Sequence, residues 1–404
     1  MIVGHINICI VCCLLAAIFV GIVDGGTMTP ILENGRPYEG KISLDPVEYG
    51  ILKEFYESMD GDNWRWSNNY MRDGKPWNFT ESPYNNPCQS HWQGLLCLNM
   101  VSAHGVGNLF YMGLTQYNIS GQLPANFFNF TKMTYMYLSE NNIQGQLPYV
   151  TQLPELMLMN FSYNSLSGTI PDCIGKATSL QLLYLSNNHL IGSIPDTFTN
   201  LLDLRYLYLL NNDLTGSLPS NIGAMKELLF LNLGVNRFRG TLPESLSELT
   251  KLEVLYLNNN TLSGGFPSCL PYSLTKLSLE CNKLTGPVPQ IFEHYANLSI
   301  LKLNDNYFTG PPPICLSTLK HLEILQLHLN QFTGPIAPLF DPQVQTKLTN
   351  IDLSHNAMSG ELPAAIFQLP ALKTFAAVKN CFSGEFVCLC FVFLFFLFVR
   401  LCVV

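Results

Sequence analysis

The chain has 404 residues, of which 48% are hydrophobic and only 12% are charged, and its formal net charge is −8. Average proteins contain about 25% charged residues, so Asn, Ser and Thr must supply much of the polar surface here. The acidic balance and the lack of a basic stripe argue against a nucleic-acid partner.

The chain begins with an apolar run over residues 8–23. This run predicts a secretory signal peptide over residues 1–25, with cleavage after Gly25. The residues before the run include His5 but no Lys or Arg, so an uncleaved anchor is the alternative. Six Asn-x-Ser/Thr sequons agree with export and are predicted glycosylation sites. They are Asn78, Asn118, Asn129, Asn160, Asn259 and Asn297.

Residues 45–104 are predicted to form an N-terminal cap. Asp45 followed by Pro46 is a favourable helix start, and Asp60-Gly61 predicts the helix end. Between them, apolar residues recur at helical spacing and predict one buried face. These residues are Val47, Ile51, Leu52, Phe55, Tyr56 and Met59. All four tryptophans lie in this region, and we expect the cap to shield an open core behind it.

The next segment repeats a glycine about every 24 residues. The glycines are Gly121, Gly145, Gly168, Gly192, Gly216, Gly240, Gly264, Gly286, Gly310, Gly334, Gly360 and Gly384. An Asn stands four residues before each of the last eleven glycines, whereas the first repeat has Tyr117 at this position. The asparagines are Asn141, Asn164, Asn188, Asn212, Asn236, Asn260, Asn282, Asn306, Asn330, Asn356 and Asn380. A fixed period of this length predicts an α/β repeat solenoid of twelve rungs over residues 105–387.

One rung, Leu180 to Pro195, shows how the repeat should fold. Leu183 and Leu185 alternate with Leu182, Tyr184 and Ser186, which predicts a short strand with one buried face. We expect the Asn188 side chain to bond the backbone of its own turn and of the next rung. Gly192 suits a tight bend, and Pro195 disfavours a regular helix in the return segment.

The full pattern resembles the plant-type extracellular leucine-rich repeat, LxxLxxLxLxxNxLxGxIPxxL. The matching prolines are Pro124, Pro148, Pro171, Pro195, Pro219, Pro243, Pro267, Pro289, Pro313 and Pro363, while rungs ten and twelve have Ala337 and Val387. The resemblance implies a curved superhelix with a parallel sheet on its concave face. It also implies a disulfide between Cys88 and Cys97, which flank Trp92-Gln93-Gly94 as in the cap of this family.

We expect a ligand-binding surface on the concave sheet, at the positions six, four and two residues before each rung's Asn. In rungs one to seven, eight aromatic residues fall there: Tyr111, Tyr135, Tyr137, Tyr184, Tyr206, Tyr208, Phe230 and Tyr256. Such rings suit contacts with a peptide or a carbohydrate. Alternatively, they stabilise the sheet by stacking on neighbouring strands. A glycan on Asn160, on the same face, would divide this patch.

The same face is polar in the later rungs, where Lys276, Ser278, Lys302, Asn304, Gln326, Asn350, Asp352 and Ser354 occupy these positions. Asp305, His328 and His355 lie on neighbouring rungs at different offsets, so we predict no metal site. The chain has no phosphate-binding loop, kinase motif or nucleophile elbow, which predicts a protein that is not an enzyme and needs no cofactor.

Residues 386–404 form a hydrophobic C-terminal segment. Its nineteen residues nearly span a bilayer as a helix, which is consistent with a transmembrane anchor. A GPI signal is an alternative, although the polar spacer is missing, and a truncated or misread end is a third.

Together, these features predict a receptor-like protein of the plasma membrane, exported through the secretory pathway. The concave face would bind an extracellular protein, peptide or carbohydrate, and the resemblance suggests a membrane co-receptor with a kinase domain. The alternatives are a secreted inhibitor of an extracellular hydrolase and a structural or adhesive surface protein.

Overall fold

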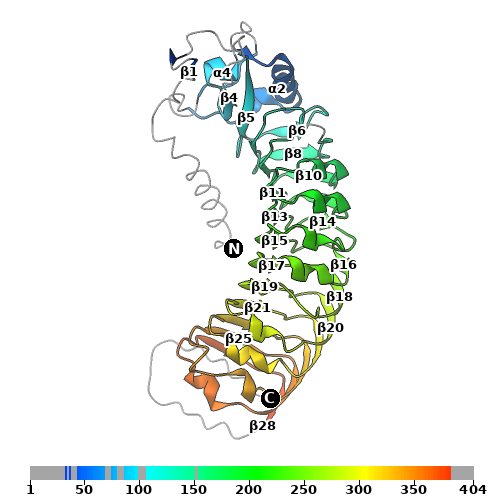
Figure 1. Cartoon of the computed structure of the whole chain (residues 1–404), viewed down its shortest axis with the longest axis vertical. Helices are drawn as coiled ribbons and strands as arrows, with labels where there is room; N and C mark the ends of the chain where they lie inside the picture. Colours follow the sequence, from blue (N-terminus) through cyan, green and yellow to red (C-terminus); the bar gives the residue numbers. More distant parts are fainter. Residues whose placement is uncertain are drawn as a thin grey trace.

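The computed structural model describes residues 32–33, 36–37, 43–68, 74–79, 86–98, 106–150 and 153–383. The repeats stack into a long arc, and the cap covers its N-terminal end (Figure 1). The predicted signal peptide and the hydrophobic C-terminal segment lie outside the described residues. Within the described ranges, no helix is long and apolar enough to cross a membrane.

The main sheet follows the concave side of the arc. It contains one strand from each of twelve rungs, paired in parallel and in chain order, with β3 at the N-terminal edge and β4 antiparallel to β5. Its strands are β3 (Ser43–Leu44), β4 (Leu95–Leu98), β5 (Val106–Gly113), β7 (Tyr135–Tyr137), β9 (Leu158–Asn160), β11 (Leu182–Tyr184), β13 (Tyr206–Tyr208), β15 (Phe230–Asn232), β17 (Val254–Tyr256), β19 (Lys276–Ser278), β21 (Ile300–Lys302), β23 (Ile324–Gln326), β25 (Asn350–Asp352) and β27 (Thr374–Ala376). This confirms the curved solenoid with a parallel concave sheet.

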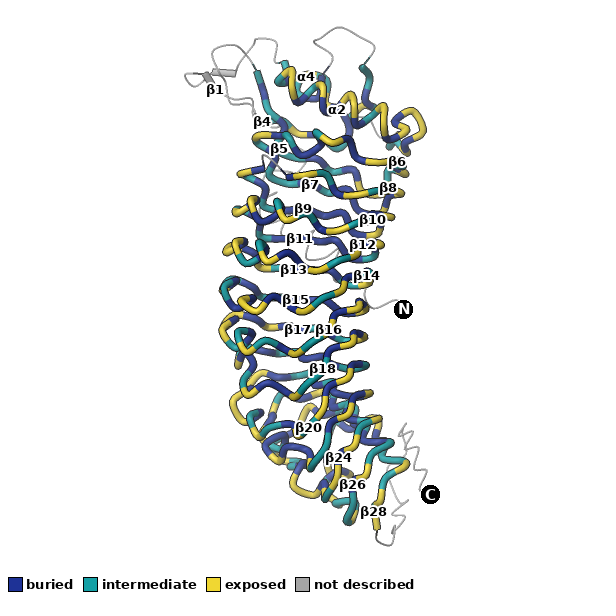
Figure 2. The backbone as a smooth tube through the Cα atoms, turned by 90° about the vertical axis from the view of Figure 1, so that its right-hand side faces the viewer, coloured by how far each residue is buried: buried dark blue, intermediate teal, exposed yellow. Residues whose placement is uncertain are grey.

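The core runs continuously through the stack because every rung contributes the same inward positions. In rung four, Leu183, Leu185 and Leu190 are fully buried, and Phe198, Leu201 and Leu204 close the other side. Figure 2 shows buried segments passing through the rungs one above another. No single rung could bury these side chains alone, so stacking supplies the core.

A second set of strands, which the sequence analysis did not predict, follows the Asn of each rung, or Tyr117 in the first rung. The first sheet contains β6 (Ser120–Gln122), β8 (Asn142–Gly145), β10 (Ser165–Thr169), β12 (His189–Gly192) and β14 (Asp213–Leu214). The second contains β16 (Arg239–Gly240), β18 (Thr261–Gly265), β20 (Lys283–Pro287), β22 (Tyr307–Gly310), β24 (Gln331–Gly334), β26 (Ala357–Glu361) and β28 (Cys381–Ser383). These strands are short, and all except β14 and β28 contain the repeated glycine, which is unfavourable within a strand and therefore concealed them in the sequence.

The return segments contain 3₁₀ helices rather than α-helices, as expected from the proline that precedes most of them. They span Asp172–Lys176, Asp196–Asn200, Ile222–Ala224, Glu244–Glu248, Phe292–His294, Ile314–Thr318, Ala337–Leu339 and Ala364–Gln368. In rung four, Pro195 precedes the helix directly and its carbonyl accepts the Phe198 N–H at 3.0 Å.

The repeated Asn forms a ladder, and its direction corrects the sequence prediction. Asn188 Oδ1 accepts the Leu166 N–H at 2.9 Å, and Nδ2 donates to the carbonyls of Phe161 and Leu185 at 3.0 and 3.1 Å. Leu166 and Phe161 belong to the preceding rung, so the ladder bonds backward and not to the next rung as predicted. The turn of each rung leaves an N–H such as that of Leu166 facing its successor, and the successor's Asn accepts it.

The first rung departs from the ladder because only the cap lies before it. Tyr117 replaces the Asn, its carbonyl accepts the Arg65 N–H at 2.7 Å, and its ring contacts Trp66 with centroids 5.7 Å apart. The cap therefore joins the first rung through aromatic packing as well as backbone hydrogen bonds.

Two positions of the repeat adopt left-handed backbone: the glycine, in rungs one to eleven where the structure describes it, and the residue before the Asn position. Gly192 has φ 80°, and a Cβ there would meet the Thr169 side chain at 2.8 Å, so the predicted tight bend does require glycine. The residue before the Asn also has positive φ in every rung, although it is never glycine. Asn187 and Asn211 suit this conformation, whereas the β-branched Val235, with φ 54°, does not.

The cap contains helix α2 (Pro46–Ser58), whose first N–H groups are accepted by the Asp45 side chain. One predicted inward residue is wrong: Val47 is 66% exposed, whereas Glu48 is buried. Glu48 Oε2 accepts the Leu109 N–H at 2.7 Å, so its carboxylate joins the helix to β5. Burial raises the pKa of Glu48, and the hydrogen bond from Leu109 opposes that rise.

The remaining cap elements surround a cluster of tryptophans, of which Trp64, Trp77 and Trp92 are buried. Cys88 in the short helix α4 (Pro87–Ser90) forms a disulfide with Cys97 in β4. Outside this cluster, a 3₁₀ helix spans Gly61–Asn63, and β1 (Leu32–Glu33) pairs antiparallel with β2 (Arg36–Pro37).

Candidate functional site on the concave sheet

The structure places all eight predicted aromatic residues on strands of the concave sheet, and we call them the aromatic strip. They lie on β5, β7, β11, β13, β15 and β17. In β13, Leu207 between two strip residues is 1% exposed and points into the core, so Tyr206 and Tyr208 face outward. The period-two alternation of a strand therefore accounts for their placement.

The rings on neighbouring strands stack on one another. Tyr208 lies between Tyr184 and Phe230, with centroid distances of 4.8 and 4.5 Å and interplanar angles of 25° and 15°. Phe230 then meets Tyr256 edge to face at 5.8 Å, and Tyr111 contacts Tyr137 at 5.8 Å. Much of the ring-face area in the centre of the strip is therefore covered by other rings.

Two leucines that the sequence analysis missed connect the two ends of the strip. Leu158 and Leu182 are buried together with Tyr184, and Tyr135, Tyr137, Tyr206 and Tyr208 pack around them. Their position six residues before the rung's Asn could have identified them, because Tyr206 and Phe230 occupy it in the next two rungs. The rings of rungs two to five therefore pack into one apolar cluster, whose centre at Leu158, Leu182 and Tyr184 is itself buried.

Burial raises the pKa of several phenols in the strip, including Tyr111, Tyr135 and Tyr256. For Tyr256, the negative charge of Glu280 on the next rung adds to the effect of burial. These phenols therefore stay protonated at physiological pH and contribute no negative charge to the face.

The predicted glycosylation sites differ in exposure. Asn118, Asn259 and Asn297 are exposed, and Asn78 and Asn129 are partly buried. Asn160 is only 6% exposed, and its Oδ1 accepts the Ser162 N–H at 3.0 Å. Glycosylation at all six positions remains a prediction.

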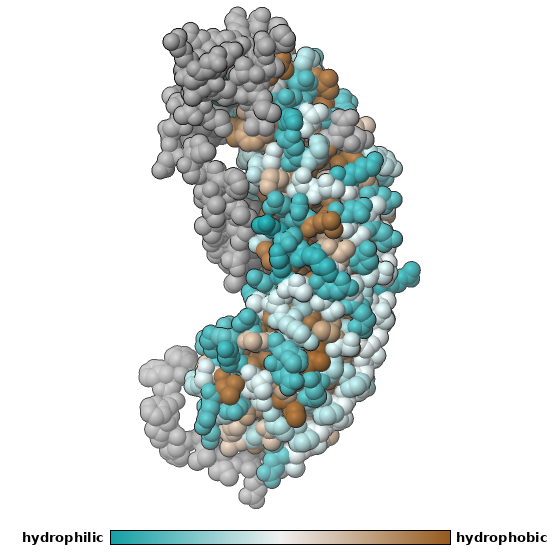
Figure 3. All heavy atoms as spheres, in the orientation of Figure 1, coloured by the Kyte–Doolittle hydropathy of each residue, from teal (hydrophilic) through white to brown (hydrophobic). Residues whose placement is uncertain are grey.

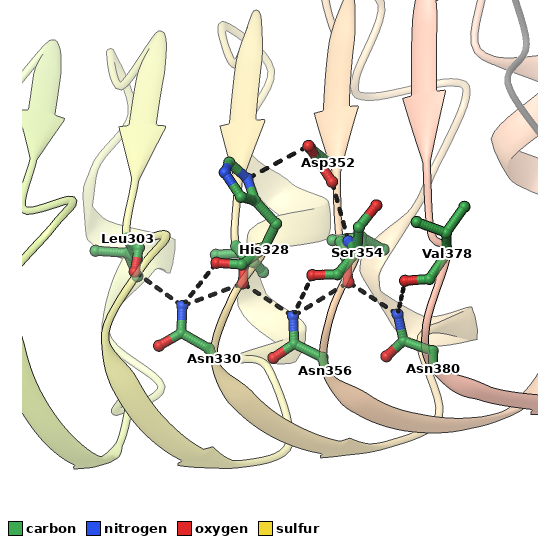
Figure 4. Close-up of polar contacts among 10 residues, drawn as sticks. Leu303, His328, Asn330, Asp352, Ser354, Asn356, Val378 and Asn380 are labelled. Atoms are coloured by element: carbon green, nitrogen blue, oxygen red, sulfur yellow. Dashed lines mark hydrogen bonds and ion pairs between the residues drawn. The ribbon is translucent and has the colours of Figure 1, made fainter. Parts of the chain in front are cut away.

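Rungs eight to eleven continue the same sheet with polar side chains. His328, which follows β23, and Asp352, at the end of β25 on the next rung, place Nδ1 and Oδ2 3.4 Å apart, and Asp352 Oδ1 accepts the Ser354 N–H at 3.0 Å (Figure 4). In the part of the chain that the structure describes, no three His, Cys, Asp or Glu side chains are grouped closely enough to hold a metal ion.

Among the described residues, the flank that faces the viewer in Figure 3 lacks a comparable surface. In the view of Figure 3, hydrophobic residues lie mostly in small, scattered groups between polar residues along the visible flank. Ion pairs between neighbouring rungs, such as Lys226–Glu248 and Arg237–Asp213, are solvent-exposed. Scattered apolar residues and exposed ion pairs are ordinary surface features, so the concave sheet is the candidate site.

Models of the leucine-rich repeat family match residues 272–332 and single repeats at 155–177, 179–201, 203–225, 251–272 and 347–369. No curated protein matches the chain.

Solved structures with the same fold include the plant peptide hormone receptor RGFR1 in complex with RGF2, at 33% identity and a TM-score of 0.61, over 67% of this chain and 47% of that one. Another match is the ectodomain of GASSHO1/SCHENGEN3 from Arabidopsis thaliana, in complex with CASPARIAN STRIP INTEGRITY FACTOR 2. The identity is 25% and the TM-score is 0.65, and the match covers 82% of this chain and 44% of that ectodomain chain. A TDR receptor matches at 28% identity and a TM-score of 0.56, and the match covers 67% of this chain and 59% of the receptor chain. The chain thus spans about half the length of these proteins. It is a leucine-rich-repeat protein with repeats of the plant type.

Proposed function

We propose that this protein is a non-catalytic recognition protein that binds an extended extracellular peptide along its concave sheet. The observation that carries the proposal is the aromatic strip, whose eight rings lie on the outward side of β5, β7, β11, β13, β15 and β17. Aromatic side chains provide large contact areas at low entropic cost, and they recur at the centres of interfaces. The rigid parallel sheet holds these rings in fixed positions before a ligand arrives, which lowers the cost of binding.

The stacking geometry favours a peptide over a carbohydrate. A sugar ring packs flat on an exposed aromatic face, but the faces of Tyr208 are directed at Tyr184 and Phe230. The central rings therefore offer mainly their edges to a ligand. Edges and hydroxyl groups suit apolar side chains and backbone amides of a peptide. The receptor RGFR1, described as a peptide hormone receptor, provides independent support from a protein with the same fold.

The location of the protein is part of the proposal. We infer an extracellular site of action, with the repeats exported through the secretory pathway and residues 386–404 attaching the protein to the plasma membrane. A membrane co-receptor with a kinase domain would then transmit the signal. Alkaline carbonate extraction of the expressed full chain tests the attachment, because an integral membrane protein stays in the pellet. Release into the medium or by phospholipase would contradict a transmembrane anchor.

A displayed library of random dodecapeptides, selected on the full chain, tests the peptide function. Tyr206→Ala with Tyr208→Ala should weaken binding of the selected peptides about tenfold or more, because each ring contributes on the order of 1 kcal/mol. The matched control is Tyr149→Ala with Tyr307→Ala, since these tyrosines are 73% and 50% exposed away from the strip. Equal binding by both double variants, with unchanged circular dichroism, would contradict the proposal.

A further inference from the structure

The aromatic strip ends at β17, and the next two strands carry the first charged side chains of the concave sheet. The outward positions of rungs one to seven contain no charged residue. Lys276 on β19 and Lys302 on β21 then face outward, and both are partly buried. Their strand neighbours Leu277 and Leu301 are fully buried and point into the core. Charge on this face therefore begins where the aromatic strip stops.

The two lysines lie on neighbouring strands beside the end of the strip. Lys276 pairs with Val254 of β17, and Lys302 pairs with Ser278 of β19. The lysines are thus one strand apart and two residues out of step, which places their Cα atoms roughly 8 Å apart. A lysine side chain is a flexible four-carbon stem with an ammonium group at its end, so both ammonium groups can reach one anion between them.

Neither of these ammonium groups is neutralised within the part of the chain that the structure describes. No ion pair and no side-chain hydrogen bond joins Lys276 or Lys302 to another described residue. On the flank, by contrast, Lys226 and Lys251 pair with glutamates of neighbouring rungs. The two concave lysines therefore carry their charges next to each other without a counter-charge.

The nearby carboxylates do not cancel this charge. Glu280 accepts the Ser278 hydroxyl, and Asp305 on the rim accepts the Cys281 thiol. Glu253, just before β17, is exposed and forms an ion pair with neither lysine among the described residues. The outward positions of rungs eight and nine thus contain two lysines and one glutamate, and their net charge is positive. A positive surface of this kind attracts an anionic group of a ligand.

We propose that Lys276 and Lys302, which we call the lysine pair, bind the carboxylate of an aspartate or glutamate side chain in the peptide ligand. A carboxylate between the two ammonium groups relieves their mutual repulsion and accepts charge-assisted hydrogen bonds from both. The sheet continues past the pair through β23, β25 and β27, so a peptide can pass over the lysines without ending there.

This inference rests on the proposed peptide function and orients the ligand. Apolar residues of the peptide lie over the aromatic strip, and its acidic residue lies over rungs eight and nine. The strip supplies contact area, and the lysine pair supplies a charge that selects among apolar peptides.

The dodecapeptides selected on the full chain test the assignment. Each displayed peptide is joined to its carrier through its C-terminus, so a carboxylate enriched by the selection comes from a side chain. We expect an Asp or Glu to one side of the aromatic or aliphatic residues. Replacing it by Asn or Gln, which keeps the shape and removes the charge, should weaken binding about tenfold. Amidation of the C-terminus of the synthetic peptide should leave the affinity unchanged.

The double variant Lys276→Gln with Lys302→Gln should abolish the preference for the acidic peptide over its Asn or Gln analogue. Its thermal unfolding midpoint should stay unchanged, because no ion pair within the described chain is lost. The matched control is Lys283→Gln with Lys320→Gln, which removes two charges from exposed positions of the same two rungs outside the concave sheet. The control changes the net charge equally and should keep the full preference.

Charge reversal distinguishes direct contact from a general loss of binding. Lys276→Glu with Lys302→Glu should bind a peptide in which lysine replaces the acidic residue more tightly than the original peptide. The unmodified protein should show the opposite order. An unchanged order in the reversed variant would contradict contact between the lysine pair and this residue of the peptide.

Four further results would overturn the assignment: selected peptides without an acidic residue, equal binding of the acidic peptide and its Asn or Gln analogue, a preference that survives Lys276→Gln with Lys302→Gln, or a loss on C-terminal amidation alone. If peptides bind but show no acidic preference, the lysine pair fails and the peptide function stands. If no peptide is selected, the peptide function and the lysine pair both fail.

Discussion

Rungs one to seven and rungs eight to twelve present two different surfaces on one sheet. The backbone is the same in both: each strand pairs in parallel with the next, and the Asn ladder runs through both. The first half covers the sheet with stacked rings, whereas the second half carries lysine, histidine, amide and carboxylate groups. This difference indicates that the buried positions of each rung determine the architecture. The outward positions vary independently and determine the chemical character of the concave surface.

The largest expected effect comes from the ladder shared by both halves. Asn188→Ala would leave the buried Leu166 N–H without its partner and would remove one of the two Asn donors from each of the Phe161 and Leu185 carbonyls, so we expect a loss of about 2 kcal/mol or more. Asn330→Ala removes equivalent bonds where the side chain is less buried, so water can replace part of them and the loss should be smaller. Denaturant unfolding of both variants measures the difference, with His189→Ala as an exposed control. Equal losses would show that burial does not distinguish the two halves.

A second comparison uses equivalent outward positions of the two halves. Tyr208→Ala removes a ring stacked between two others, and we expect a loss of about 2 kcal/mol. Gln326→Ala at the equivalent position of rung ten should change the free energy of unfolding by less than about 0.5 kcal/mol. If both substitutions cost the same, ring stacking does not stabilise the first half.

A third comparison concerns backbone strain before the Asn. Val235 on rung six is β-branched with φ 54°, and Leu329 on rung ten has the same φ without the branch. Val235→Asn should stabilise the protein by about 1 kcal/mol, and Leu329→Asn by less. The reverse change, Asn211→Val, should destabilise it, and thermal unfolding of the three variants measures these shifts. Destabilisation by Val235→Asn would mean that the Val235 side chain makes packing contacts worth more than the strain.

The smallest effect is the pH dependence that Tyr256 contributes to the stability of the aromatic half. The folded-state pKa of Tyr256 is raised above its ordinary value of 10.0. Stability from this group is therefore complete below pH 10 and declines as the pH rises through the unfolded and then the folded pKa. Tyr256→Phe should remove that part of the alkaline loss, as measured by thermal midpoints and by tyrosinate absorbance. An identical alkaline decline in the variant would assign the loss to other groups.

The sequence by itself determined the solenoid, its period and the outward placement of the aromatic residues. Leucines repeating at fixed spacing around Asn and Gly have one way to bury their side chains, which is to stack, and strand alternation then fixes which residues face outward. Helical spacing predicted that Val47 of the cap is buried, but Val47 is exposed and Glu48 is buried. The Glu48 carboxylate is held inside because it accepts the N–H of Leu109, sixty-one residues away.

Tertiary structure alone decided the features that depend on neighbouring rungs. The backward direction of the Asn ladder depends on which backbone groups a preceding turn leaves unpaired, and one rung read in isolation does not contain that information. The second set of strands arises from the same stacking. The contact of His328 with Asp352 and the covering of ring faces around Tyr208 likewise exist only once residues about 24 apart in sequence lie side by side.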